Sequence, residues 1–197
     1  GLRPTRGTLT LSFANVDAFL RFDPRRPYAT RFIDEDFNRV WNAQTLDGPR
    51  DSTELRRARA IRPFVEAADY LLDIHSMLEP SPPVMICGPL DKGIRFAFDI
   101  AIPRDIVCDG GHANGTRMRD FVQFGDPGSP RNALLVECGQ HWERAAEHVA
   151  WQTTWRFLRH TGAVDADLAA REIDAAEPPP QRLVRVTQAV IARTPDF

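Results

Sequence analysis

The sequence predicts an α/β domain in which a mixed, mostly parallel sheet is flanked by helices. The first observation is that apolar runs of strand length recur along the chain and that helical stretches separate or follow several of them. The second is that these runs are nearly continuous rather than alternating, which is typical of strands buried on both faces. The third is an ordinary globular composition over 197 residues, 43% hydrophobic and 26% charged, enough for one domain with a real core.

Strands and helices can be assigned in chain order from these patterns. Apolar content and length predict strands at 8–14, 70–76, 83–88, 104–109 and 132–139. A helix is expected from Asp51, which with Glu54 resembles a capping box, and apolar residues then recur at helical spacing up to Ala68. Further helices are expected at 142–162, ended by Gly162, and at 165–176.

Two stretches are predicted to be irregular. Residues 89–131 are rich in Gly, Pro, Asp and Arg, and we expect long loops around short elements there. The run "EPPP" at 177–180 is a stiff break and a natural domain boundary. We therefore predict an N-terminally incomplete α/β domain at 1–176 and, at 177–197, a linker with the start of a C-terminal β-rich domain. The abrupt ends of the chain lead us to expect a piece of a longer protein.

The net charge and the cysteine content bear on which partners the protein binds and on the cellular compartment in which it works. The formal net charge is −2 and the sequence pI is about 6.2, so no basic face for nucleic acid is expected. No apolar run approaches the ~20 residues of a membrane span. Three cysteines without a C-x-x-C pair indicate buried thiols in a reducing compartment, and we expect a cytoplasmic protein. A homo-oligomer is left open.

The segment "TRFIDEDFNRVW", residues 30–41, is the most unusual in the chain. It places two arginines, three carboxylates and an asparagine among aromatic and aliphatic residues. One interpretation is a solvated surface loop laced with salt bridges. The other is an anion site, because Arg offers a planar fork of donors that matches a carboxylate and Asn adds a directional amide. The neighbouring acids could then orient the arginines.

Two further residues stand at the ends of predicted strands. His75 directly follows an apolar strand, and Asp73, two residues earlier, would point to the same face and could orient the imidazole. Glu137 ends another apolar strand, where a carboxylate is either paired or has a raised pKa, as expected of a general base. The simpler alternatives are a histidine satisfied by local hydrogen bonds and a helix-capping or salt-bridged glutamate.

In order along the chain, "TRFIDEDFNRVW", "LLDIHS" and "LLVECG" resemble the succinylglutamate desuccinylase/aspartoacylase family, a branch of the zinc carboxypeptidase-like fold. The resemblance covers roughly residues 7–160. It implies a zinc-dependent hydrolase that cleaves the amide bond of an N-acyl amino acid or a related small anionic substrate. It also implies that His75 is a zinc ligand, that Asn38 and Arg39 grip the substrate carboxylate, that Arg31 lies near the scissile carbonyl, and that Glu137 is the general acid/base.

The sequence also departs from the family. The family takes its first two zinc ligands from an upstream H-x-x-E motif, and none of the five histidines here is followed three residues later by Glu. His75 alone cannot hold a catalytic zinc, which needs about three protein ligands. Either the chain begins after that motif, which the abrupt start favours, or the protein is a metal-free variant. A peptide-cleaving metallocarboxypeptidase and a non-catalytic carboxylate-binding module therefore remain alternatives. Specificity residues cannot be aligned among Arg117, Arg119 and Arg131.

Overall fold

The computed structural model describes residues 3–112 and 114–188. Its helices and strands, with the short 3-10 helices labelled η, follow in chain order: α1 (Val16–Leu20), η1 (Phe37–Arg39), α2 (Ala43–Asp47), α3 (Thr53–Ala67), β1 (Tyr70–Met77), β2 (Val84–Ile86), α4 (Asp91–Ile100), β3 (Asp105–Cys108), η2 (Met118–Asp120), η3 (Val122–Phe124), β4 (Asn132–Gln140), α5 (Arg144–His160), α6 (Ala166–Glu172) and β5 (Arg182–Arg185).

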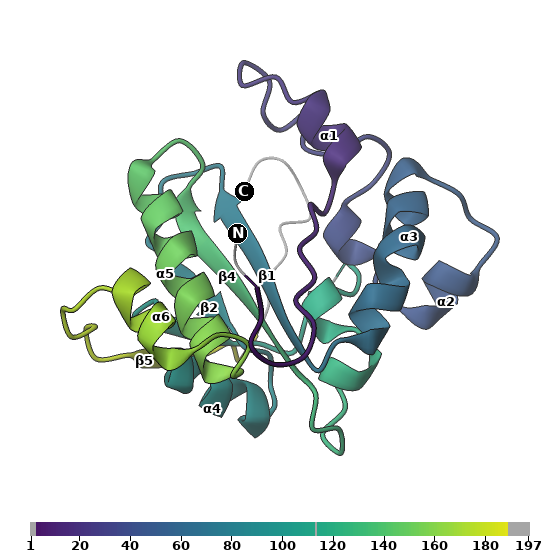
Figure 1. Ribbon diagram of the computed structural model, residues 1–197. Coiled ribbons are helices and arrows are strands. Elements are labelled where there is room, and N and C mark those ends of the chain that lie inside the picture. Colours follow the sequence, from purple (N-terminus) through teal and green to yellow (C-terminus); the bar gives the residue numbers. More distant parts are fainter. Residues whose placement is uncertain (1–2, 113, 189–197) are drawn as a thin grey trace.

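One five-stranded sheet, in the order β1-β4-β2-β3-β5, forms the centre of the molecule (Figure 1). The β1–β4, β2–β3 and β3–β5 pairs are parallel, and only β2–β4 is antiparallel. The predicted mixed, mostly parallel sheet flanked by helices is therefore confirmed. No helix in the described ranges is long and apolar enough to cross a membrane.

A separate hydrophobic cluster covers each face of the sheet. One packs α4, α5 and α6 against the sheet, and the other packs α2, α3 and the 3-10 helices against the opposite face. Strand β4 contributes to both clusters, because Leu134 and Val136 belong to the first and Ala133 to the second. Burial on both faces explains why this strand reads as a continuous apolar run.

Three of the helices and four of the strands lie where the sequence predicts them. The helix α3 begins one residue later than expected: Ser52, not Asp51, is its N-cap and accepts a hydrogen bond from the Leu55 N–H at 3.0 Å. Gly162, with a φ of +69°, follows the last turn of α5 as expected.

Two predictions about secondary structure are wrong. Residues 8–14 form no strand: Leu11 and Phe13 are more than four-fifths exposed, and only Leu9 and Ala14 of this segment pack against the core. Within 89–131, α4 is a regular ten-residue helix that buries Ile94, Ala97 and Ile100 at helical spacing. Its start carries no side-chain cap, so the usual signal for a helix beginning is missing.

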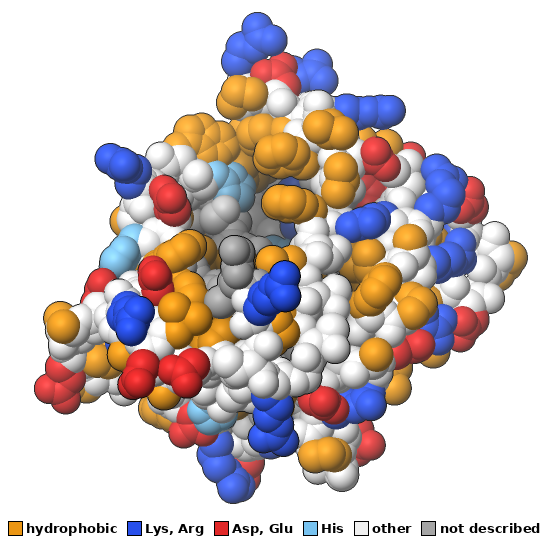
Figure 2. Space-filling model, viewed as in Figure 1, with side chains coloured by type: hydrophobic (Ala, Val, Ile, Leu, Met, Phe, Trp, Pro, Cys, Tyr) orange, Lys and Arg blue, Asp and Glu red, His pale blue; other side chains and the backbone are white. Residues whose placement is uncertain are grey.

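Part of the C-terminal segment adds a strand to the sheet. Residues 182–185 form β5 and pair in parallel with β3, at the sheet edge. The predicted boundary at 177 and the predicted β-rich domain remain predictions, and residues 189–197 of that segment lie outside the described residues. Figure 2 shows hydrophobic side chains gathered around α1, where Phe19 and Leu20 are largely exposed.

Candidate active site

The candidate site forms where two neighbouring strands end. Strands β1 and β4 run in parallel with His75 directly opposite Glu137. Residues paired in this way project to the same face of a sheet, so these two predicted site residues lie side by side. The carboxyl ends of parallel strands are where ligands bind in open α/β sheets.

His75 is held by a carboxylate. Its Nε2 lies 2.9 Å from Oδ1 of Asp73, which is 6% exposed, so the expected Asp73–His75 contact is present. Burial alone would lower the pKa of His75, but the carboxylates of Asp73, Glu137 and Asp36 outweigh it and raise this pKa to about 9. With Nε2 directed to Asp73, Nδ1 makes no hydrogen bond in the described part of the chain and is the nitrogen left for another partner.

Asn38 ties the charged segment to the strand ends. It is buried in η1, and its Nδ2 lies 3.2 Å from Oδ2 of Asp73 and 3.3 Å from Nε2 of His75. Its Oδ1 accepts a hydrogen bond of 2.7 Å from the Met118 N–H. The amide thus already has protein partners at both ends. Binding a substrate carboxylate through Asn38 remains a prediction, and it would require an exchange of these bonds.

The two predicted arginines share one carboxylate. Nη2 of Arg31 lies 2.6 Å from Oδ2 of Asp36, and Nη2 of Arg39 lies 3.7 Å from the same oxygen. Arg39 also donates from Nη1 to the Asn38 carbonyl at 2.7 Å. The Arg31 side chain is 52% exposed and that of Arg39 is 22% exposed, so both can still be reached from solvent.

Glu137 is a partly buried carboxyl group directly opposite His75. Burial raises its pKa, against the opposing charge of His75. Its Oε2 is buried and has no hydrogen-bond partner among the described residues. A carboxylate oxygen buried without a hydrogen-bond partner is costly, and groups with perturbed pKa values are concentrated at functional sites. The structural alternatives of a capping or salt-bridged glutamate do not describe this oxygen.

Arg117 is a further charged residue of the site, one that the sequence did not assign. It is 9% exposed, and its Nη1 donates to both carboxylate oxygens of Asp109, at 3.0 and 2.9 Å. Burial raises the pKa of Glu137, and the charge of Arg117 opposes this effect. Burial lowers the pKa of Arg39, and the charge of Arg117 adds to this effect. Strand β3, which precedes Arg117 in the chain, ends at Cys108 and runs opposite to β1 and β4, so no strand-end signal in the sequence could have singled out this arginine.

The other two unaligned arginines have structural partners. Arg119 is buried and donates to the carbonyls of Cys87 and Ala133. Arg131 lies near Asp69, 3.7 Å away, at the amino ends of β1 and β4. Neither reaches His75 or Glu137 by any contact in the described structure.

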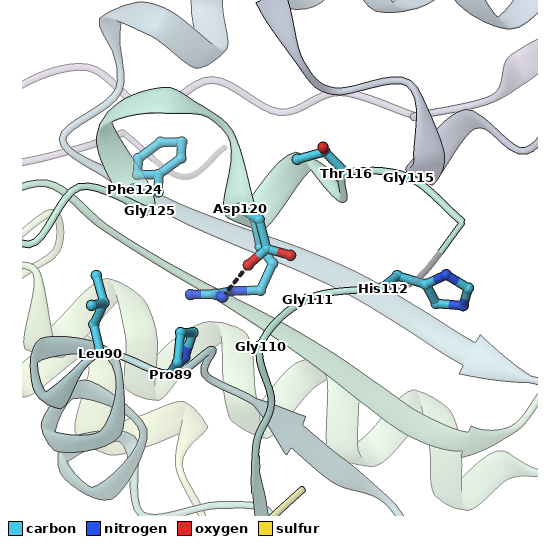
Figure 3. Close-up of a pocket in the computed structure, with 11 residues that line it drawn as sticks. Pro89, Leu90, Gly110, Gly111, His112, Gly115, Thr116, Asp120, Phe124 and Gly125 are labelled. Atoms are coloured by element: carbon cyan, nitrogen blue, oxygen red, sulfur yellow. Dashed lines mark hydrogen bonds and ion pairs between the residues drawn. The ribbon is translucent and has the colours of Figure 1, made fainter. Parts of the chain in front are cut away.

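Two cavities lie at opposite ends of the sheet. A groove of about 410 Å³ runs beside His75, with Ser76, Cys138 and His141 in its wall. A second cavity of about 250 Å³ lies beyond β2 and β3. Figure 3 shows Asp120 at its centre, between Phe124 and the glycine-rich segment that leads to His112. The Asp120 carboxylate is bound to the guanidinium of Arg119. The groove is the one that contains a predicted site residue.

The residues present do not make a complete zinc site. No group of three or more His, Cys, Asp and Glu side chains within 3–112 and 114–188 is arranged to hold a metal ion. His75 offers one imidazole ligand, whereas a catalytic zinc takes about three protein ligands. Zinc binding therefore remains a prediction for the whole protein.

Comparison with known proteins gives a fold. No protein-family model matches the sequence, and no curated protein matches it either. Among solved structures, the chain is similar to a succinylglutamate desuccinylase/aspartoacylase from Rhodobacter sphaeroides, with a TM-score of 0.58 and 17% identity over 83% of this chain and 50% of that one. The chain is also similar to succinylglutamate desuccinylase from Vibrio cholerae, with a TM-score of 0.55 and 19% identity over 87% of this chain and 52% of that one.

An ectoine utilization protein from Ruegeria pomeroyi is also similar, with a TM-score of 0.53 and 14% identity over 78% of this chain and 47% of that one. The chain thus spans about half the length of the solved structures it matches. At these identities the likeness concerns the fold alone. The chain has the α/β fold of the succinylglutamate desuccinylase/aspartoacylase structures, as its sequence motifs implied.

Proposed function

We propose that the chain carries the substrate-binding and proton-transfer part of a hydrolase that cleaves the amide bond of an N-acyl amino acid. The single observation that carries this proposal is the pairing of His75 with Glu137, whose buried oxygen has no partner, next to a loop with two accessible arginines. The fold shared with desuccinylase and aspartoacylase structures supports the same reaction class.

Each residue has a role in this proposal. Glu137 takes a proton from water as the water oxygen bonds to the amide carbonyl carbon, and gives that proton to the amine nitrogen when the C–N bond breaks. Arg31 stabilises the negative charge on the carbonyl oxygen, and Asn38 with Arg39 orients the substrate through its carboxylate. The products are a carboxylic acid and an amino acid.

Zinc dependence is part of the proposal for the whole protein. His75 would be one ligand, with Nδ1 available and Asp73 fixing the ring through Nε2. Bound zinc would supply Lewis-acid activation of the carbonyl and of water. The remaining ligands are not among the described residues, which keeps a metal-free carboxylate-binding module in view as a second candidate.

The compartment and the partners of the protein are proposed from its cysteines and its net charge. Three buried free cysteines are typical of a reducing compartment, so we place the protein in the cytoplasm. A net charge of −2 gives no support for a nucleic-acid partner. The expected partner is a small anionic substrate, and a homo-oligomer is left open.

The test is hydrolysis by the full-length protein, supplied with zinc, of a panel of N-succinyl and N-acetyl amino acids. Each acid is paired with its amide or ester lacking the free carboxylate. The proposal expects release of the amine from the acids and much slower release from the neutral analogues. Binding of the acids without turnover would support the metal-free binding module instead, and preferred cleavage of peptides would support a carboxypeptidase.

A further inference from the structure

Glu54, in the first turn of α3, is a fully buried carboxylate with unusual partners. It accepts hydrogen bonds from three successive backbone N–H groups of the charged segment: Ile33 at 2.7 Å, Asp34 at 3.1 Å and Glu35 at 3.3 Å. Asn15 adds a fourth bond through Nδ2 at 3.1 Å. Burial would raise the pKa of Glu54, but these bonds outweigh it and lower the pKa.

Side chains of the charged segment in turn accept hydrogen bonds from the start of α3. Oδ2 of Asp34 accepts a hydrogen bond from the Thr53 N–H at 2.7 Å, and Oε1 of Glu35 accepts one from the Ser52 hydroxyl at 2.6 Å. The start of the helix and the loop thus satisfy each other's polar groups. This explains two of the three acids in the segment, since Asp34 and Glu35 fix it to α3 while Asp36 faces the arginines.

The residues held in this way stand between the proposed substrate-binding groups. Arg31 lies two positions before the first N–H that Glu54 accepts, and Asn38 and Arg39 lie three and four positions after the last. Fixing the backbone of 33–35 therefore limits where both arginines can go. In the described structure Glu54 contacts neither His75 nor Glu137, so it acts through the loop and does not touch the reacting atoms.

We propose that Glu54 is a positioning residue that holds the loop of residues 31–39 in the conformation that receives an anionic substrate. The inference rests on the proposed function for its consequence, but its structural part can be measured independently. If Glu54 only anchored α3, its loss would lower overall stability without a specific effect on the loop. If it positions the loop, its loss frees residues 31–39 while the sheet and α3 stay ordered.

The decisive variant is Glu54→Gln in the full-length protein. It keeps the size of the side chain, but it replaces one acceptor oxygen by an amide NH2 group, a donor that would face the backbone N–H donors. We expect hydrogen–deuterium exchange of residues 31–39 to become at least about tenfold faster, while exchange in α3 and β4 is unchanged. Supporting groups of this kind are typically worth about 10- to 100-fold in binding or activity. We therefore expect KM for an N-acyl amino acid to rise about tenfold, with little change for its neutral amide.

Asn15→Ala is the matched control, because it removes one bond to Glu54 and leaves the three loop contacts in place. Its exchange pattern at 31–39 and its KM should stay near the wild-type values. Glu54→Asp keeps the charge and shortens the side chain, so it makes the same comparison at smaller amplitude if the Gln variant does not fold.

Unchanged exchange at 31–39, or equal losses on the acid and its neutral analogue, would overturn the proposal. If the wild-type protein hydrolyses no substrate, the proposed function fails separately. Exchange at 31–39, and calorimetric binding of succinate as a simple dicarboxylate probe, then still decide whether Glu54 holds an anion-binding loop.

Discussion

At the scale of single residues, the strongest chemical signal is the isolation of the Glu137 carboxyl group. Its Oε2 has no hydrogen-bond partner among the described residues, and burial raises its pKa. We expect Glu137→Gln in the full-length protein to fold normally and to lose about 10²- to 10⁴-fold in kcat, the usual contribution of a general acid–base group. Stopped-flow or steady-state assays, with melting temperature as the control for folding, measure this. Near-normal turnover would remove Glu137 from the mechanism.

Arg39 tests whether the charged segment is a receptor or a salt-bridged loop. Its contacts with Asp36 and with the Asn38 carbonyl leave part of the guanidinium accessible. Arg39→Lys keeps the charge but loses the planar fork, so a clamp on a substrate carboxylate should weaken by about 10- to 100-fold. The loss should appear in kcat/KM for an N-acyl amino acid and be nearly absent for its neutral amide.

Arg50→Lys is the matched control for Arg39→Lys, because Arg50 forms an exposed ion pair with Glu35 in the same region, with Nη2 3.0 Å from Oε2. Exposed ion pairs contribute only about 0–1 kcal/mol to stability, so Arg50→Lys should change kcat/KM for neither the N-acyl amino acid nor its neutral amide. Equal losses on both substrates for Arg39→Lys, with a lower melting temperature, would show that Arg39 is structural.

At the scale of elements, the contact between α3 and the charged segment should make the stability of the protein fall with pH in the acid range. The pKa of Glu54 is lowered in the fold from its ordinary value of 4.5 by bonds to Ile33, Asn15 and Asp34 that exceed the effect of burial. A depressed carboxylate contributes stability that is fully present above the unfolded pKa and is lost as pH falls through the folded pKa. The difference in melting temperature between wild type and Glu54→Gln should therefore be largest above about pH 5 and shrink as the pH falls below 4.5.

The start of α4 shows how tertiary contact can reverse a helix propensity. Replacing glycine by alanine inside a helix normally stabilises it by about 1 kcal/mol. A Cβ added at Gly93 would lie 2.2 Å from the Cys87 carbonyl oxygen, which is backbone and cannot move aside. We therefore expect Gly93→Ala to lower the free energy of unfolding by about 1–3 kcal/mol, measured by urea denaturation. Arg95→Ala, at an exposed position of the same helix, should have little effect.

At the scale of the whole molecule, the sheet was predictable because its strands are apolar runs, and the run of the interior strand β4 is the longest. Burial on both faces makes 132–139 a continuous apolar run. Strands β2 and β3 alternate buried with half-buried positions, whereas β1, at the sheet edge, leaves Tyr70 and Ile74 exposed. The same composition misled at 8–14, since an apolar segment becomes a strand only if an edge is available to pair with it. Residues 182–185 show the converse, because they pair with β3 even though a separate domain was expected there.

The site was predictable only in part. His75, Glu137 and the charged segment stood out because each is polar in apolar surroundings. Strand order brought His75 and Glu137 together, which no local pattern encodes. Arg117 and Glu54 were not assigned to the site because their importance lies in partners far away in sequence: Arg117 acts on Glu137 twenty positions later, and Glu54 binds backbone groups of a loop about twenty positions earlier.

The last prediction concerns metal content, which belongs to the whole protein. His75 presents one imidazole whose ring is fixed by Asp73, and about three protein ligands are needed for a catalytic zinc. We expect the 197-residue chain to bind zinc weakly and the full-length protein to bind about one zinc per chain. Metal analysis after dialysis against zinc, compared with His75→Ala, measures this. The variant should lose the metal while keeping its melting temperature in the presence of chelator within a few degrees of wild type. A full-length protein that stays without stoichiometric zinc would rule out the metal-dependent hydrolase and leave the carboxylate-binding module as the better account of the charged segment.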